Sequence, residues 1–132
     1  LIEGIKKGVV DVITSNHQPH ENEIREVEFP IAPMGCIGTQ IAFPMALTYL
    51  LDELDLETIV KTMSINPRTI LQTDIPVIKE GFVANLTLFD THTEWKFDKS
   101  SNSSLSENTP MLDSTLKGKV HGTILGNYLH FS

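Results

Sequence analysis

The fold is decided by the stretch Val9-Val10-Asp11-Val12-Ile13-Thr14-Ser15-Asn16-His17-Gln18-Pro19-His20. Residues 9–14 are apolar or β-branched except for Asp11, which is typical of a parallel strand covered on both faces. Two histidines, an asparagine and a proline follow at once, as they do where a buried strand presents functional side chains from its carboxyl end. The stretch therefore predicts a buried strand with a polar, functional tip.

Helices are predicted on both sides of this strand. Residues 1–7 place apolar side chains on one side and two lysines near the end, where cations complement the helix dipole, and Gly8 ends the helix. Three later helices are predicted at residues 39–51, 56–63 and 66–71, with Thr39, Asp55 and Asn66 as their N-caps and Pro67 at the first position of the last. A helix followed by a parallel strand and more helices is typical of an α/β fold.

From residue 75 the apolar period changes from helical to alternating. Short strands are predicted at residues 82–89 and 94–97, a polar loop at 99–109, and a hairpin of 119–125 with 128–131 around Gly126-Asn127. The chain is therefore predicted to divide into an α/β part, residues 1–74, and a small β module, residues 75–132. One strand and its helices cannot bury both faces of that strand, so residues 9–13 need a sheet that this sequence does not contain.

Composition excludes several classes of protein. The 132 residues are 40% hydrophobic and 20% charged, and the formal net charge is −7, so neither disorder nor a nucleic-acid partner is expected. The single cysteine, Cys36, excludes an internal disulfide and a cysteine-rich zinc site. No apolar run is long enough for a transmembrane helix and no signal peptide is evident, which predicts a cytoplasmic location. Because the chain starts at Leu1, almost directly before the predicted strand, we expect a fragment of a larger protein.

The polar tip allows more than one chemistry. His17 and His20 are three residues apart, and such a pair can bind a metal or position an anion. The segment 32–38 contains glycines and precedes a helix, so its main-chain N–H groups suit a carboxylate ligand. Between them, residues 18–35 form a long charged loop, and a loop of that length is either functional or only solvated. The residues alone leave these alternatives open.

Several motifs in register resemble a known family. They are Ser15-Asn16-His17-Gln18-Pro19-His20, Ala32-Pro33-Met34-Gly35-Cys36-Ile37-Gly38-Thr39-Gln40-Ile41-Ala42-Phe43-Pro44, Ser64-Ile65-Asn66-Pro67-Arg68, Gly81-Phe82-Val83-Ala84-Asn85-Leu86-Thr87-Leu88-Phe89-Asp90, Glu94-Trp95, Ser106-Glu107-Asn108-Thr109-Pro110 and Leu116-Lys117-Gly118-Lys119-Val120. Their order resembles the C-terminal third of dihydroorotases, members of the amidohydrolase superfamily, over nearly the whole chain.

The resemblance implies the C-terminal fragment of a metal-dependent (β/α)8 barrel, its last strand plus helices, followed by strands of a small β-sandwich module. It implies a hydrolase of pyrimidine biosynthesis that interconverts N-carbamoyl-L-aspartate and dihydroorotate. The family's zinc ligands lie on earlier strands, so we expect no metal site and no turnover in this chain alone. The expected partners are a small-molecule substrate and the missing N-terminal barrel portion.

The resemblance also implies roles for particular residues. Asn16 falls at the aspartate that binds metal and shuttles the proton, and a neutral amide cannot accept that proton. His20 falls at a histidine that contacts substrate, and Met34 and Gly35 at a loop pair that also contacts it. The role of His17 stays open.

Three interpretations compete. In the first, the parent protein is a dihydroorotase or a related hydantoinase or allantoinase. In the second, which Asn16 favours, it is a non-catalytic relative that serves as a structural partner, for example of aspartate carbamoyltransferase. In the third, the chain is a fragment whose exposed surfaces are covered by self-association. Other candidate groups are interpreted as structural: Cys36 as a packed thiol, and His92, His121 and His130 as residues of the β module.

Overall fold

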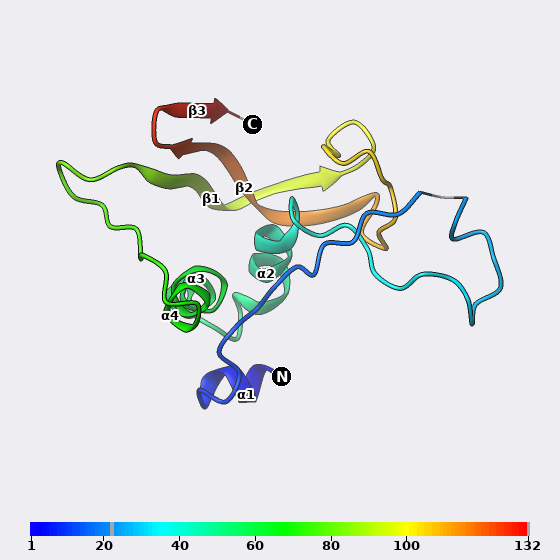
Figure 1. The fold of residues 1–132 in the computed structure, drawn as a ribbon, viewed down its shortest axis with the longest axis horizontal. Helices are drawn as coiled ribbons and strands as arrows, with labels where there is room; N and C mark the ends of the chain where they lie inside the picture. The colour runs from blue at the N-terminus through cyan, green and yellow to red at the C-terminus, as the bar shows by residue number, and fades with distance from the viewer. Residues whose placement is uncertain (22, 132) are drawn as a thin grey trace.

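The computed structural model describes residues 1–21 and 23–131 and has helices below a curved sheet (Figure 1). The helices are α1 (Ile2–Lys6), α2 (Ala42–Leu50), α3 (Leu56–Val60) and α4 (Asn66–Ile70), with a π-helical turn at Lys61–Ile65 between the last two. The strands are β1 (Asn85–Phe97), β2 (Ser114–Leu125) and β3 (Tyr128–Phe131). None of the helices in the described part of the chain has the length and apolar character that a membrane span requires.

The sheet is antiparallel with strand order β1-β2-β3. The predicted hairpin is confirmed, since β2 and β3 pair on either side of the turn at Gly126, whose φ is +60°. The two strands predicted at residues 82–89 and 94–97 are instead one strand, β1, with an irregular register between Asp90 and Glu94. The Asp90 carboxylate accepts the main-chain N–H groups of His92 and Thr93, at 2.6 and 2.7 Å, and so satisfies amides that the irregular ladder leaves unpaired.

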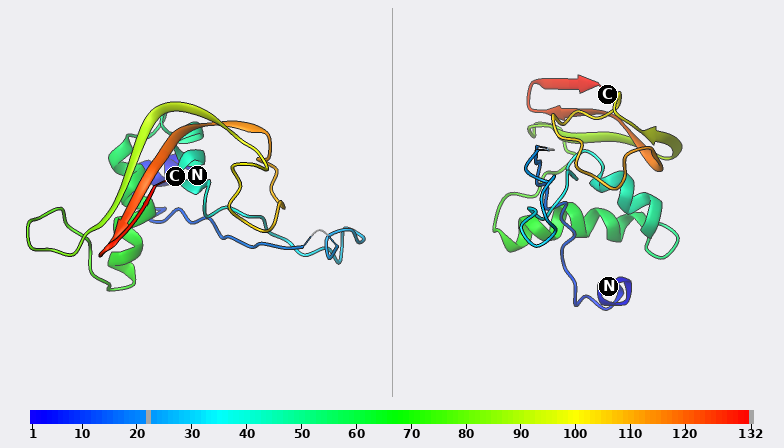
Figure 2. Two further views of the ribbon diagram at one scale, coloured as in Figure 1. Left: turned by 90° about the horizontal axis from the view of Figure 1, so that it is seen from above. Right: turned by 90° about the vertical axis from the view of Figure 1, so that its right-hand side faces the viewer.

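The core joins α2 to the underside of the sheet (Figure 2). One buried cluster contains Ile37, Ile41, Phe97 and Leu116, and a second contains Ala46, Leu47, Leu54 and Ile59. Gly118, at φ +84°, allows the closest approach, because a Cβ there would overlap the Leu47 side chain. The first cluster takes residues from both sides of the expected boundary at residue 75, and the division into two domains stays a prediction.

The run from α3 to α4 is continuous and contains a π-helical turn because of Pro67. Proline has no N–H, and the N–H of Asn66 bonds to the carbonyl of Lys61 instead of that of Thr62. The carbonyl of Thr62 is left free and accepts the N–H of Ile13 at 3.0 Å. The predicted cap at Asp55 is confirmed, since its side chain accepts the N–H of Thr58 at 2.7 Å. The predicted caps at Asn66 and Thr39 are wrong, because Ile65 and Ile41 occupy those positions and neither makes a side-chain cap bond.

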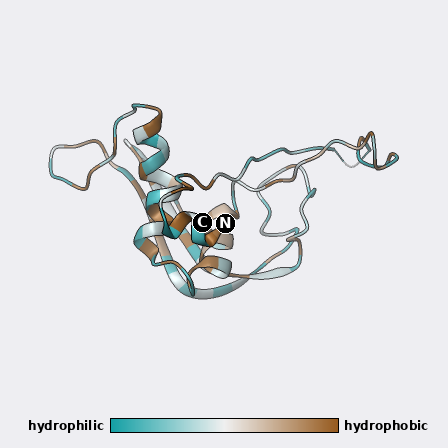
Figure 3. Cartoon of the chain, turned by 90° about the horizontal axis from the view of Figure 1, so that it is seen from below, coloured by the Kyte–Doolittle hydropathy of each residue, from teal (hydrophilic) through white to brown (hydrophobic). Residues whose placement is uncertain are grey.

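The predicted buried strand at residues 9–14 is extended but is not part of a sheet. No strand pairs with it among the described residues, and Val9 is 76% exposed. Apolar and polar residues alternate around the helices (Figure 3), and along this segment Val10, Val12 and Ile13 are only half-buried. The prediction of a buried strand is therefore not met within residues 1–21 and 23–131, because a strand needs a paired neighbour and none of the described strands lies beside this segment.

Candidate functional site

The predicted site residues lie together at the base of a long loop. His17 and Cys36 form an isolated parallel bridge, and the N–H of Gln18 donates to the carbonyl of Cys36 at 2.9 Å. This bridge brings the tip of the extended segment beside residues 34–38. The loop between them extends away from the rest of the chain (Figure 1), and its residues 23–31 are exposed. The structure therefore joins two motifs that the sequence separates.

His20 contacts the second motif directly. Its Nε2 lies 3.1 Å from the carbonyl oxygen of Met34, within hydrogen-bond distance. The Met34 side chain is 88% exposed, so the main chain of Met34 makes this contact while its side chain is free. A half-buried imidazole beside a main-chain carbonyl can hold a polar substrate by donating or accepting hydrogen bonds.

Gly35 is required by close packing as well as by its backbone conformation. Its φ is +109°, a region that L side chains rarely adopt, and a Cβ there would lie 2.8 Å from the Cβ of Gln18. Any larger residue at this position would push Gln18 away. The two motifs approach each other this closely only because position 35 has no side chain.

Asn16 is exposed at the tip of the extended segment. Its φ of +43° is in the left-handed region, which asparagine and aspartate tolerate better than most residues. Its Oδ1 accepts the Nε2 amide hydrogen of Gln18 at 3.4 Å. The group is a neutral amide with negligible basicity, so at this position it can accept a hydrogen bond but cannot take up a proton near neutral pH.

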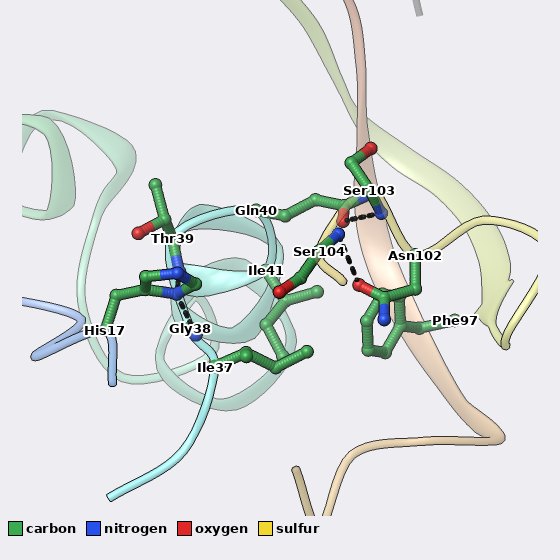
Figure 4. A pocket seen from close by; sticks show the side chains of 10 residues that line it. All are labelled: His17, Ile37, Gly38, Thr39, Gln40, Ile41, Phe97, Asn102, Ser103 and Ser104. Atoms are coloured by element: carbon green, nitrogen blue, oxygen red, sulfur yellow. Dashed lines mark hydrogen bonds between the residues drawn. The ribbon is translucent and has the colours of Figure 1, made fainter. Parts of the chain in front are cut away.

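His17, whose role the sequence left open, supports the turn before α2. Its Nδ1 accepts the N–H groups of Gly38 and Thr39 at 3.0 and 3.3 Å. Because Nδ1 accepts, the neutral ring carries its proton on Nε2. His17 also lines one side of a hollow of about 260 Å³, with Asn102, Ser103 and Ser104 on the other side (Figure 4). In the structure its ring accepts hydrogen bonds from these two main-chain N–H groups.

Asn108 is the site residue to which the sequence analysis gave no role. It is 5% exposed, and its Nδ2 donates to the carbonyls of Gln18 and Gly35 at 3.0 and 3.3 Å. Its Oδ1 accepts the N–H of His20 at 3.4 Å, and the hydroxyl of Ser106 lies against both this oxygen and the carbonyl of His20. The only sequence signal was its place in the motif 106–110, because its partners are 73 to 90 residues away along the chain.

No zinc site can be assembled from the residues that the structure describes. In residues 1–21 and 23–131, no three His, Cys, Asp or Glu side chains come together in a way that could hold a metal ion. Asn16 offers one neutral oxygen, and a stable zinc site needs three or four nitrogen, sulfur or carboxylate ligands. The residues present do not fit a metal by themselves.

The remaining candidate groups lie apart from this site or inside packing. His92, His121 and His130 are exposed on β1, β2 and β3. Cys36 is a half-buried free thiol on the wall of a second, mostly apolar hollow of about 310 Å³ between the extended segment and α2. Their interpretation as structural residues stays a prediction.

Sequence comparison finds curated relatives of the chain. Over 126 residues the chain is 40% identical to a dihydroorotase of Aquifex aeolicus, and over 128 residues it is 38% identical to a dihydroorotase of Ruminiclostridium cellulolyticum. The chain is a relative of the dihydroorotases. These alignments cover 94% and 96% of the chain, which spans 29% and 30% of the length of the two curated relatives. No protein-family model matches the chain.

The dihydroorotase-related chain also has close structural neighbours. The L-hydantoinase (dihydropyrimidinase) of Arthrobacter aurescens matches 97% of the chain with a TM-score of 0.85 at 24% identity, over 30% of its own length. The D-hydantoinase (dihydropyrimidinase) of Thermus sp. matches 99% of the chain with a TM-score of 0.85 at 15% identity, over 31% of its own length. At these identities the match shows a shared fold. The resemblance found in the motifs is therefore confirmed, and the fold agrees with it.

Proposed function

We propose that the chain supplies the C-terminal part of a cyclic amidohydrolase of the dihydroorotase type. The full-length protein would interconvert N-carbamoyl-L-aspartate and dihydroorotate in pyrimidine synthesis, in the cytoplasm. The observation that carries the proposal is the contact between His20 and the carbonyl of Met34, beside Gly35, in a chain 40% identical to a dihydroorotase. These three residues are the ones that the family resemblance assigns to substrate contact.

In this proposal, residues 9–14 form the last strand of a (β/α)8 barrel and the sheet β1-β2-β3 belongs to a β-sandwich. Residues 9–14 are extended but pair with no described strand, and Val9 is exposed. Both features support the barrel, because a strand with apolar side chains on both faces needs neighbouring strands. Zinc, held by ligands outside this chain, belongs to the same proposal. The chain alone would neither hold the metal nor turn over substrate.

The substrate has carboxylate and amide groups, which would be bound by hydrogen-bonding groups at the base of the loop. His20 would bind and orient the substrate, together with the main chain of Met34 and Gly35. Asn16 would contact the ring as a neutral hydrogen-bond partner and would take no proton. Proton transfer would therefore be the slow step of catalysis, or would not occur.

The test is hydrolysis of L-dihydroorotate by the full-length protein, with hydantoin and allantoin as competing substrates. Activity on L-dihydroorotate that is lost in His20→Ala and retained in His121→Ala supports the proposal, because His121 is exposed on β2. Preference for hydantoin or allantoin would assign the protein to one of the related activities instead.

A second candidate function is favoured by Asn16. If the base is missing, the full-length protein would serve as a non-catalytic structural partner, for example of aspartate carbamoyltransferase, or would associate with itself. Replacement of Asn16 by aspartate separates the two candidates. A gain of at least tenfold in turnover in Asn16→Asp would show a site that lacks only its base, since general acid–base catalysis contributes about 10² to 10⁴-fold. No gain in a metal-bound protein would favour the structural partner.

A further inference from the structure

We propose that Asn108 is a positioning residue, which fixes His20 and the Met34-Gly35 main chain in the arrangement that binds substrate. The inference rests on the proposed function and adds to it a residue outside the loop that contacts substrate. Asn108 lies in the polar segment that precedes β2, far from the loop in sequence. It reaches the loop only through the fold.

The side chain of Asn108 joins the two ends of the loop. Its two N–H donors bond to the carbonyl of Gln18, where the loop begins, and to the carbonyl of Gly35, where it ends. Its own main-chain carbonyl accepts the N–H of Ile37 at 3.0 Å. One residue therefore bonds to both arms of the loop, and the width of the loop base depends on it.

The acceptor side of the same amide holds His20. Oδ1 of Asn108 accepts the N–H of His20, and the hydroxyl of Ser106 bridges Asn108 and the carbonyl of His20. The imidazole of His20 in turn lies against the carbonyl of Met34, one residue before Gly35. Asn108 thus fixes the main chain on both sides of the contact between His20 and Met34. A shift of either arm would separate the imidazole from that carbonyl.

The chemistry of the amide explains why asparagine is needed. Both amide donors and the amide oxygen are engaged in a residue that is 5% exposed, by the carbonyls of Gln18 and Gly35 and by the N–H of His20. An aspartate of the same shape would keep the acceptors but would place a carboxylate against two carbonyl oxygens. A buried polar group without its partner is costly, so the loop base would open to relieve the repulsion.

The test uses Asn108→Asp and Asn108→Ala in the full-length protein, with Asn102→Ala as the matched control. Asn102 lies in the same polar segment, and its side chain bonds only within it, to Ser104 and Ser106. Two quantities are measured: hydrogen–deuterium exchange of residues 23–35 and the dissociation constant of L-dihydroorotate. We expect faster exchange and at least tenfold weaker binding in both Asn108 variants, and neither change in Asn102→Ala.

A pH series separates positioning from general stability. On acidification the carboxylate introduced by Asn108→Asp gains a proton and with it one donor, so the binding defect of this variant relative to wild type should shrink. The defect of Asn108→Ala should not change with pH in this way. Unchanged exchange in residues 23–35 of both variants would overturn the proposal. If wild type does not bind L-dihydroorotate, the proposed function fails, while the exchange data still decide whether Asn108 holds the loop.

Discussion

The side-chain amide of Asn66 donates to the main-chain carbonyl of Asp11 at 2.9 Å, although the two residues are 55 positions apart. Two residues further along the extended segment, the N–H of Ile13 donates to the carbonyl of Thr62. The π-helical turn and the first residue of α4 therefore hold the segment that leads to the site at two points.

Replacement of Pro67 by alanine should loosen this attachment. The new N–H at position 67 can bond within the helix and compete with Ile13 for the carbonyl of Thr62. We expect the helix to become more stable while the amide of Ile13 exchanges faster with solvent. Hydrogen exchange followed by NMR measures both, and slower or equal exchange at Ile13 would contradict the assignment of the π-helical turn to Pro67.

Replacement of Gly35 by alanine should destabilise the chain more than replacement of Gly8. Both glycines have a positive φ, at +109° and +65°, so both variants have a strained backbone, which costs about 1 to 2 kcal/mol. A Cβ at Gly8 meets nothing within 4 Å, whereas one at Gly35 collides with Gln18. The collision should add about 1 to 3 kcal/mol to the loss of unfolding free energy, as overpacking does. Urea denaturation of both variants measures the difference, and equal losses would show that Gln18 moves aside freely.

Replacement of Leu47 by alanine should remove a central contact between α2 and the sheet. The side chain is 1% exposed and packs in the cluster with Ala46, Leu54 and Ile59. Truncation of a fully buried leucine costs about 2 to 5 kcal/mol of unfolding free energy. Tyr49 on the same helix is 57% exposed, and Tyr49→Ala should cost much less. Comparable losses in thermal unfolding would contradict the placement of α2 against β2.

The N-cap at Asp55 should make stability depend on pH in the acid range. Hydrogen bonds from the side chain and the main chain of Thr58 hold the pKa of the Asp55 carboxyl below its ordinary value of 3.8. A group whose pKa is lower in the folded state contributes stability above its unfolded pKa and loses it as the pH falls through the folded pKa. The amide introduced by Asp55→Asn can still cap α3 but cannot titrate, so the variant should lose less stability than wild type between about pH 5 and about pH 2. Identical acid unfolding curves would contradict this role.

Local signals predicted the parts of the fold that depend on neighbouring residues. The cap at Asp55 and the hairpin at Gly126 are confirmed because their partners lie within a few positions. The cap predicted at Thr39 is wrong because α2 begins only at Ala42, with Ile41 at the N-cap position. The continuity of β1 was missed because it depends on how Asp90 bonds to the amides of an irregular ladder.

In the candidate site, too, residues in local motifs could be predicted and a residue with distant partners could not. His20, Met34 and Gly35 were named from motifs, and the structure brings them together. Asn108 was not named, since an asparagine in a serine-rich polar loop has no local feature that reveals partners up to 90 residues away. Sequence motifs named three residues that meet at the base of the loop, whereas the residue that bonds to both arms of the loop became visible only in the fold.

The most direct test of the account is calorimetric titration of L-dihydroorotate into the full-length protein and its His20→Ala variant. Binding does not require a base at position 16, so the measurement is valid whether or not Asn16 permits turnover. We predict saturable binding to wild type that is weakened at least tenfold, about 1.4 kcal/mol, in His20→Ala. Absence of binding to a folded wild-type protein, or equal affinity in the two proteins, would contradict the assignment of this site to a cyclic amide substrate.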